Sequence, residues 1–271
     1  MENEVLKRLQ TTEMEILDVL DSFCARHGIQ YSLAAGTAIG AIRHQGFIPW
    51  DDDIDIAMSR TEYNKFCRAW KQNPIDGYYL ENYLDDKYCG TSHAKLRKDG
   101  TVMLSEGEDE KHGHHGIWVD IFPCDKIPKD EKKTNQIIKY GRRVIFFTRA
   151  NVISYNDDIV KKLVRYAIRL IPYAVRHRLL LEAADWLVKN NEKIDGDYEW
   201  ISMSTLGSLS IRYHQNLMDE TIRVKFEDRE YNIFREYDDM LRCLYGDYMT
   251  LPPIEERVCK HAPIKLEFEK R

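Results

Sequence analysis

The sequence lacks the features that mark several large classes of protein. Its 271 residues include only 14 glycines and 8 prolines, and 43% are hydrophobic against 31% charged. This composition excludes a collagen-like or a disordered chain. No apolar run is long enough to cross a bilayer, and residues 1–20 are too charged for a secretory signal. We therefore expect a globular, cytoplasmic protein.

The cysteines show no sign of a disulfide framework or a zinc site. There are six, and none forms a C-x-x-C pair: Cys24, Cys67, Cys89, Cys124, Cys243 and Cys259. Without a secretory segment, scattered cysteines of this kind are expected to be reduced thiols.

The net charge of −5 is unevenly distributed along the chain. Residues 126–181 hold 14 Lys+Arg and 4 Asp+Glu, a net charge of +10. The rest of the chain holds 26 Lys+Arg and 41 Asp+Glu, a net charge of −15. A basic amphipathic helix can lie on an anionic membrane. Peripheral membrane contact through this basic stretch, at the inner face of the membrane, is one expectation. A solvated surface around an ordinary helical core is the other.

The hydrophobic pattern predicts an α+β fold, with a mixed sheet, flanking helices and a further α-helical module. We expect a helix over 2–27 ended by Gly28, and a second helix that starts at an N-cap, Ser59, and runs to about Gln72. Strands are expected near 29–35, 50–58, 78–83, 93–98, 101–104 and 116–122, with Asp99-Gly100 as a hairpin turn and Pro123 as a strand end.

The second half of the chain reads as mainly helical. Residues 131–190 have helical spacing broken at Pro172, a hairpin is expected at 224–234, and a last helix at 235–245. We divide the chain into a core at 1–127 that includes the N-terminal helix, a mainly helical basic module at 128–223, and a C-terminal hairpin and helix at 224–271 that close on the core.

The densest chemical signal is W-D-D-D-I-D-I at residues 50–56, with Asp51, Asp52, Asp53 and Asp55 in five positions. Carboxylates so close repel one another unless a cation offsets them. On a strand, Asp51, Asp53 and Asp55 would share one face and Asp52 the other. Three carboxylates on one edge make a hard oxygen site for Mg²⁺ or Mn²⁺. The alternative to a cation site is an ordinary acidic turn exposed to solvent.

Two further features strengthen this interpretation. Gly36-Thr37 precedes a short helix, and such a turn offers backbone N–H groups to a phosphate. Asp120 lies in the apolar run I-W-V-D-I-F-P, where a charge is costly unless it is paired or metal-bound. We expect Asp120 to join Asp53 and Asp55 in a set that can hold two divalent ions and support displacement at phosphorus.

Basic residues near these motifs are candidates for a diphosphate. Lys95 and Arg97 are two apart on an expected strand, so they share a face. We assign them to binding of a diphosphate, against the alternative of an ordinary surface pair. Arg43 is expected either to hold a phosphate or to pair with Asp51 or Asp52.

The histidine-rich loop G-E-D-E-K-H-G-H-H-G is a weaker signal. His112, His114 and His115 lack the ligand spacing of a structural metal site, so a solvated loop is favoured over metal binding.

Several separated motifs resemble the LicD family, which includes bacterial phosphocholine transferases and is similar to the fukutin group of eukaryotes. They are G-T-A-I-G-A-I-R-H-Q-G-F-I-P-W-D-D-D-I-D-I, A-K-L-R-K-D-G-T, G-I-W-V-D-I-F-P-C-D and L-Y-G-D-Y-M-T-L-P-P. They occur in the right order, and the resemblance runs from about Leu9 to His261.

The resemblance implies a nucleotidyltransferase-like fold and a metal-dependent phosphotransferase. A phospho-alcohol, most often phosphocholine, would pass from a CDP-linked donor to a hydroxyl of a cell-surface glycan or its lipid-linked precursor, such as lipopolysaccharide or teichoic acid, with release of CMP. By the resemblance, Asp53 and Asp55 match the metal-binding pair, Asp51 the first acidic position, and Asp120 the third catalytic carboxylate.

Two roles are open for the residues after the last expected helix: a C-terminal latch on the core or, as the resemblance favours, the border of the pocket. They are Tyr245, Asp247, Tyr248, the Pro252-Pro253 pair and His261. A choline site needs aromatic faces around the quaternary ammonium. Tyr83, Tyr88, Trp118 and Tyr248 are the sequence candidates.

Three other functions remain open at this stage. An EF-hand-like calcium loop would run from Asp51 to Glu62, although its sixth position is Ile56 rather than the required glycine. A nucleotidyltransferase would move a nucleoside monophosphate from a nucleoside triphosphate to a small acceptor. A glycosyltransferase could use the D-x-D pair for its metal. No nucleic-acid partner is indicated.

Overall fold

A computed structural model describes residues 2–105, 111–150, 159–261 and 263–269. The core elements in chain order are α1 (Asn3–His27), β1 (Ser32–Leu33), α2 (Ala35–Ile39) continued by a π-helical turn (Gly40–His44), β2 (Asp55–Ser59), α3 (Arg60–Gln72), β3 (Tyr78–Glu81), β4 (Ala94–Lys98), β5 (Val102–Leu104) and β6 (Trp118–Pro128). They are followed by α4 (Glu131–Arg149), α5 (Ile159–Arg169), α6 (Tyr173–Asn191), β7 (Tyr198–Ser202), β8 (Thr221–Phe226), β9 (Arg229–Phe234), α7 (Tyr237–Tyr245) and β10 (Lys265–Glu267).

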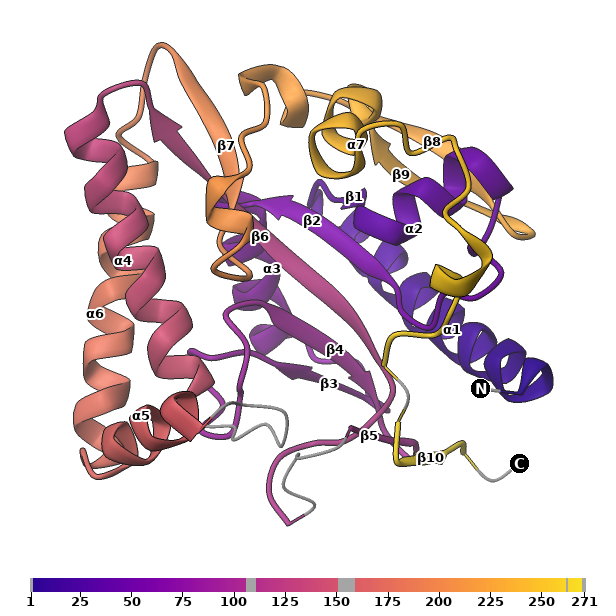
Figure 1. The fold of residues 1–271 in the computed structure, drawn as a ribbon, viewed down its shortest axis with the longest axis horizontal. Coiled ribbons are helices and arrows are strands. Elements are labelled where there is room, and N and C mark those ends of the chain that lie inside the picture. The colour runs from indigo at the N-terminus through magenta and orange to yellow at the C-terminus, as the bar shows by residue number, and fades with distance from the viewer. Residues whose placement is uncertain (1, 106–110, 151–158, 262, 270–271) are drawn as a thin grey trace.

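The main sheet has the strand order β1-β2-β6-β4-β3, with β7 also paired to β6. β2 and β6 run parallel, whereas β1, β4 and β7 are antiparallel to their neighbours. The predicted mixed sheet is therefore confirmed. In Figure 1, α1 and α3 lie behind this sheet, and α2 and α7 lie in front of it near β2.

Local sequence signals account for the ends of two helices. Gly28 ends α1 in the left-handed conformation, with φ of 59°, which glycine adopts without a Cβ clash. The Ser59 hydroxyl accepts the Glu62 backbone N–H at 3.2 Å and caps α3. Glu62 does not complete the capping box, because its carboxylate accepts the Gln30 N–H instead.

Strand β6 is longer than the sequence predicts. Pro123 was expected to end it, yet β6 continues to Pro128. β4 pairs with β6 only as far as Ile121, and β7 pairs with it from Cys124 onward. Pro123 therefore sits at the changeover between two partner strands, where its missing N–H leaves no gap in either ladder.

The expected hairpin at Asp99-Gly100 is wrong. β4 pairs with β3 and β6, whereas β5 pairs with β10 near the C-terminus. Asp99-Gly100 does form a turn. The strand that pairs with β5, however, lies more than 150 residues further along the chain, and local sequence carries no information about it.

The helical module packs on its own core. Residues from α4, α6 and β7 form a second buried cluster that includes Ile137, Ile145, Leu180, Leu187 and Ile201. α6 begins directly after Pro172, where the sequence places a break. Because β7 belongs to the main sheet, residues 128–223 are not purely helical; the division into three domains stays a prediction.

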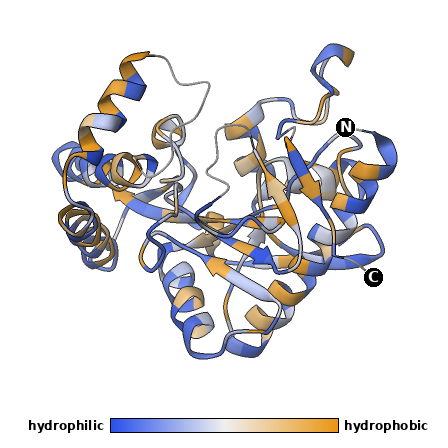
Figure 2. Cartoon of the chain, turned by 90° about the horizontal axis from the view of Figure 1, so that it is seen from below, coloured by the Kyte–Doolittle hydropathy of each residue, from blue (hydrophilic) through white to orange (hydrophobic). Residues whose placement is uncertain are grey.

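The helices are amphipathic, as bands of hydrophobic and hydrophilic residues alternate along them in Figure 2. Within the described ranges, no helix combines the length and the apolar character needed to traverse a bilayer.

The C-terminal predictions hold in outline. β8 and β9 form a two-stranded hairpin whose turn residues are Glu227 and Asp228, and α7 ends at Tyr245. The following segment passes in front of the sheet edge and reaches β10 beside β5 (Figure 1). This path carries C-terminal residues past the acidic run.

Candidate active site

The aspartate pair of the candidate site is built by the parallel pairing of β2 and β6. Asp55 and Asp120 are register partners on these neighbouring strands, and the Asp120 N–H donates to the Ile54 carbonyl at 2.9 Å. Partners in register point to the same face of a sheet. The acidic run and Asp120, which are 65 residues apart, thus meet in the fold.

Asp51 and Asp53 precede the strand in an extended loop rather than within it, because β2 begins at Asp55. Their carboxyl groups hydrogen-bond to each other, so one of them must carry the proton. Burial, reinforced by the charges of Asp53 and Asp52, raises the pKa of Asp51 to about 8. Burial also raises the pKa of Asp53.

Asp55 and Glu13 also have raised pKa values. Burial and the charges of Asp53 and Asp120 hold the pKa of Asp55 well above its usual range. The same causes, burial first and the acidic run second, hold the pKa of Glu13 high. The Glu13 Oε2 atom is buried and has no hydrogen-bond partner among the described residues.

Glu13 was missed in the sequence, although a signal existed. It occupies the apolar stripe of α1, between the fully buried Leu9 and Ile16. A carboxylate on the buried face of an amphipathic helix is costly, so its position there was itself an indication of function.

Asp120 differs from the other carboxylates because hydrogen-bond donors, among them the Lys95 ammonium, surround it. Its Oδ1 accepts from Lys95 Nζ at 2.8 Å and from His93 Nε2 at 2.9 Å, and its Oδ2 accepts from Trp118 Nε1 at 2.8 Å. Burial opposes ionisation, but Lys95 and His93 outweigh it and hold the pKa of Asp120 far below its usual range. The lowered pKa favours the ionised form of Asp120.

His93 was also missed in the sequence. It precedes β4, bonds Asp120 through Nε2, and lies against the Phe122 ring with centroids 4.5 Å apart. Its Nδ1 is buried without a partner among the described residues. Its spacing of two from Lys95 in an expected strand could have placed it on the same face.

Asp52 contacts the C-terminal segment, yet its carboxylate lies within 4.8 Å of a ligand atom of Asp53. The expected placement of Asp52 on the opposite face is wrong, because residues 51–54 precede the strand. The buried Asp52 carboxylate accepts the backbone N–H groups of Lys260 at 3.1 Å and His261 at 3.0 Å, and contacts His261 Nδ1 at 3.3 Å. Despite burial, these bonds lower the pKa of Asp52, and the bond to Asp52 raises the pKa of His261. Asp52 thus fixes the C-terminal segment beside the site.

The donor set fits a hard divalent cation. Asp51, Asp53 and Asp55 are crowded carboxyl groups whose pKa values stay raised although Lys260, His261 and Lys95 partly offset them, a pattern that suits carboxylates arranged to bind a cation. In the part of the chain that the structure describes, the three residues whose ligand atoms lie within 4.8 Å of one another are Asp52, Asp53 and His261. This set differs from the predicted ligands Asp51, Asp53, Asp55 and Asp120, whose role stays a prediction.

Gly36 and Thr37 lie against the acidic run. A Cβ on Gly36 would stand 2.8 Å from Asp51 Oδ2, so only glycine lets the carboxylate approach. The Thr37 hydroxyl accepts the Asp55 N–H at 2.8 Å. Both residues therefore shape the acidic loop, and their binding of a phosphate stays a prediction.

Of the three basic residues predicted to hold phosphate groups, Lys95 lies in the site, whereas Arg97 and Arg43 bond to other parts of the protein. Lys95 contacts Asp120, and its ammonium lies 4.0 Å from the Trp118 ring centroid. Arg97 shares the face of Lys95 as predicted, but it is buried and bonds Glu81 and the Gly116 carbonyl. Arg43 donates to the Tyr248 and Thr250 carbonyls rather than to Asp51 or Asp52, so the expected carboxylate pairing is wrong.

The rival metal sites find no support. His114 bonds Asp99 and stacks on Tyr79, and His112 stacks on Tyr88, so these rings are used in packing. The calcium-loop alternative fails because Asp55–Ser59 form a strand paired on both edges, where an EF-hand requires an irregular loop.

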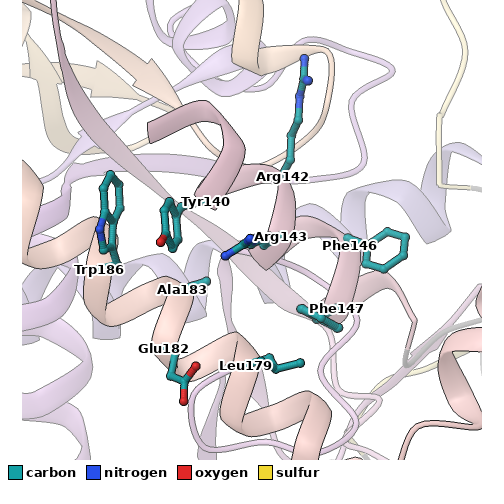
Figure 3. A pocket seen from close by; sticks show the side chains of 9 residues that line it. All are labelled: Tyr140, Arg142, Arg143, Phe146, Phe147, Leu179, Glu182, Ala183 and Trp186. Atoms are coloured by element: carbon teal, nitrogen blue, oxygen red, sulfur yellow. The ribbon is translucent and has the colours of Figure 1, made fainter. Parts of the chain in front are cut away.

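Two hollows matter for ligands. The larger, of about 710 Å³, lies between α4 and α6 and is lined by Arg142, Arg143, Phe146, Leu179 and the stacked rings of Tyr140 and Trp186 (Figure 3). The smaller, of about 140 Å³, starts at Asp55 and follows the same sheet face past Ala57 and Phe122. The smaller hollow therefore belongs to the acidic site.

The site is a set of carboxyl groups gathered from two parallel strands of a mixed sheet, beside a glycine turn, and it is the place where the sequence predicts binding of a divalent cation and a phosphate. Comparison with known proteins places the chain in a family. Residues 28–159 match the family described as "LicD/FKTN/FKRP, nucleotidyltransferase domain". The chain is 30% identical over 265 residues to the lipopolysaccharide cholinephosphotransferase LicD of Haemophilus influenzae, covering 96% of this chain and 97% of that protein. The chain belongs to the LicD family.

A further relative is an uncharacterized protein of Rickettsia typhi. It is 25% identical over 147 residues, which cover 52% of this chain and 45% of the relative.

Proposed function

We propose that this protein transfers phosphocholine from a CDP-linked donor to a hydroxyl of a cell-surface glycan or its lipid-linked precursor, with release of CMP. Membership of the LicD family makes the chain an enzyme of the phosphotransferase class. The full-length similarity to a lipopolysaccharide cholinephosphotransferase supports choline as the alcohol and lipopolysaccharide as the type of acceptor. The observation that carries the proposal is the register pairing of Asp55 with Asp120.

We assign Mg²⁺ or Mn²⁺ to Asp53 and Asp55, with Asp51 and Asp120 as further oxygen ligands. When bound, such a cation neutralises charge on the donor diphosphate and on the leaving CMP. Asp51 and Asp53 give up the proton they share on binding it, since carboxyl ligands must be ionised.

The residues of the chain then position the reactants. Lys95 is held beside Asp120 and supplies a positive charge for the transferred phosphoryl group. A carboxylate with so low a pKa is a weak proton acceptor, so Asp120 acts by fixing Lys95 and by its charge rather than as a strong base. Catalysis rests on positioning and charge, as phosphoryl transfer requires.

The test is a comparison of CDP-choline, CDP-ethanolamine, CDP-glycerol and CDP-ribitol with Mg²⁺, scored by CMP release. Release of CMP from CDP-choline that disappears on chelation supports the proposal. Release of pyrophosphate from ATP or CTP, without turnover of any CDP-alcohol, would assign the chain to the nucleotidyltransferases that act on nucleoside triphosphates.

We also propose that α5 brings the protein to an anionic membrane surface, where a lipid-linked acceptor would reside. Apolar side chains of α5 face outward, with Ile159 76% and Leu163 63% exposed, and Leu170 just after the helix is 86% exposed. Basic residues alternate with them from Lys161 to Arg169. An exposed apolar face bordered by basic residues fits an interfacial helix.

Vesicle sedimentation tests this surface. Binding to vesicles of phosphatidylglycerol, weak binding to phosphatidylcholine, and loss of binding in Leu163→Glu/Leu170→Glu support the proposal. The control is Leu206→Glu, which changes an exposed leucine outside α5. Unchanged binding by the double variant would remove α5 from the interface.

A further inference from the structure

A cavity of about 140 Å³ lies beside Asp55 and is lined by residues of one face of the main sheet. Asp55 and Ala57 alternate on β2, and Asp120, Phe122 and Cys124 alternate on β6, so all five share that face. The cavity begins at Asp55, where the predicted cation ligands are, and extends toward Cys124.

Its lining is apolar and aromatic. Three aromatic residues from separate segments surround it: Phe122 of β6, Tyr213, and Phe234 at the end of β9. Two methionines, Met218 and Met240, complete the wall. The aromatic residues that the sequence singled out, Tyr83, Tyr88, Trp118 and Tyr248, are not in this lining.

The serine hydroxyls of the lining hydrogen-bond within the protein. The Ser208 hydroxyl donates to the Ser202 carbonyl at 2.9 Å, and the Ser202 hydroxyl donates to Ser204 at 3.1 Å. A nucleobase needs partners for its ring nitrogens and carbonyl, and these serine hydroxyls are already engaged with one another and with the backbone. An apolar cavity of about 150 Å³ accommodates a benzene-sized group. A compact apolar group therefore fits, whereas a nucleoside is too large.

We propose that this cavity binds the trimethylammonium group of the donor and selects choline over other alcohols. The inference rests on the proposed function. A quaternary ammonium is apolar on its surface and positively charged, so it favours aromatic faces next to a carboxylate. With the diphosphate at the carboxylates, the two-carbon arm of choline leads along the sheet face from Asp55 toward Phe122.

The neutral carbon isostere of choline, 3,3-dimethylbutanol, separates charge from shape. We would measure binding of CDP-choline and of CDP-3,3-dimethylbutanol by calorimetry with Mg²⁺ present. The wild-type protein should bind CDP-choline at least about 10-fold more tightly, since desolvated cation–π contacts contribute about that much. Equal affinities for the two ligands would overturn the proposal.

Two variants locate the effect. Phe122→Leu keeps apolar volume but removes a ring, so the preference for CDP-choline over its isostere should fall by about 5-fold or more. Ala57→Val fills the cavity, so it should lower the affinity for both ligands about equally and leave the ratio of the two affinities unchanged. Phe66→Leu and Ala184→Val are matched controls, because both lie in the core away from the cavity.

The outcomes separate the two proposals. If no CDP-alcohol yields CMP, the proposed function fails. If CDP-choline yields CMP but neither Phe122→Leu nor Ala57→Val changes binding of the two ligands beyond the controls, only the assignment of this cavity fails.

Discussion

Removal of one charge from the acidic run should stabilise the protein without metal. Burial and neighbouring carboxylates raise the pKa of Asp51 from 3.8 to about 8, so the folded protein binds this proton more tightly than the unfolded chain. The free energy of unfolding therefore falls as the pH rises from 3.8 through about 8. Asp51→Asn, which keeps the shape and stays neutral, abolishes this loss.

The size of the effect follows from the pKa shift. Within that interval each pH unit costs about 1.4 kcal/mol, so the three units from about pH 5 to about pH 8 set an upper limit of about 4 kcal/mol. Asp51 shares its proton with Asp53, so we expect about half of this, about 2 kcal/mol. For a chain of this size that corresponds to a gain in Tm of about 4–8 °C.

The assay is thermal unfolding in the presence of a chelator at about pH 5 and about pH 8. Asp51→Asn should raise Tm at the higher pH and have little effect at the lower. Asp76→Asn, at an exposed aspartate, is the control and should do neither. A Tm for Asp51→Asn that is lower than wild type at both pH values would refute the crowding of these carboxylates.

Other perturbations address separate parts of the molecule. Asp53→Asn should abolish transfer while leaving Tm in chelator equal or raised; near-normal turnover would contradict the metal assignment. Asp120→Asn should lower turnover by about 10²–10³-fold, as expected when a charge that orders the site is removed, and more than it weakens donor binding; equal losses would assign Asp120 to binding. Calorimetry should show Mg²⁺ affinity rising from about pH 6 to about pH 9 with proton release, because the raised pKa of Asp51 keeps its carboxyl protonated at the lower value; a pH-independent affinity would oppose this. Arg60→Met should cost about 3–5 kcal/mol by leaving Asp125 buried and unpaired, and a double variant with Asp125→Leu should recover much of that loss in urea unfolding.

Much of the fold follows from local sequence. Gly28, Ser59 and Pro172 each mark a helix boundary through backbone chemistry that acts within a few residues. The β8–β9 hairpin is equally local. The pairing of β5 with β10, and the continuation of β6 past Pro123, depend on contacts distant in sequence, and these the sequence could not supply.

The site divides in the same way. The meeting of Asp55 and Asp120 was predictable, because each is an acid in an apolar strand and nothing else explains its cost. The ion pair of Arg97 with Glu81 could not be predicted, and neither could the hydrogen bond of Arg43 to the chain beyond α7. A basic side chain pairs with the acceptor that the fold brings close to it. The spacing of residues along the sequence does not identify that acceptor.

The length of β6 couples two parts of the molecule mechanically. Its first half holds Asp120 between β2 and β4, and its second half is clasped by β7, which is built into the core of α4 and α6. The backbone that fixes Asp120 beside Asp55 is therefore the same continuous strand that anchors the α4–α6 layer to the sheet.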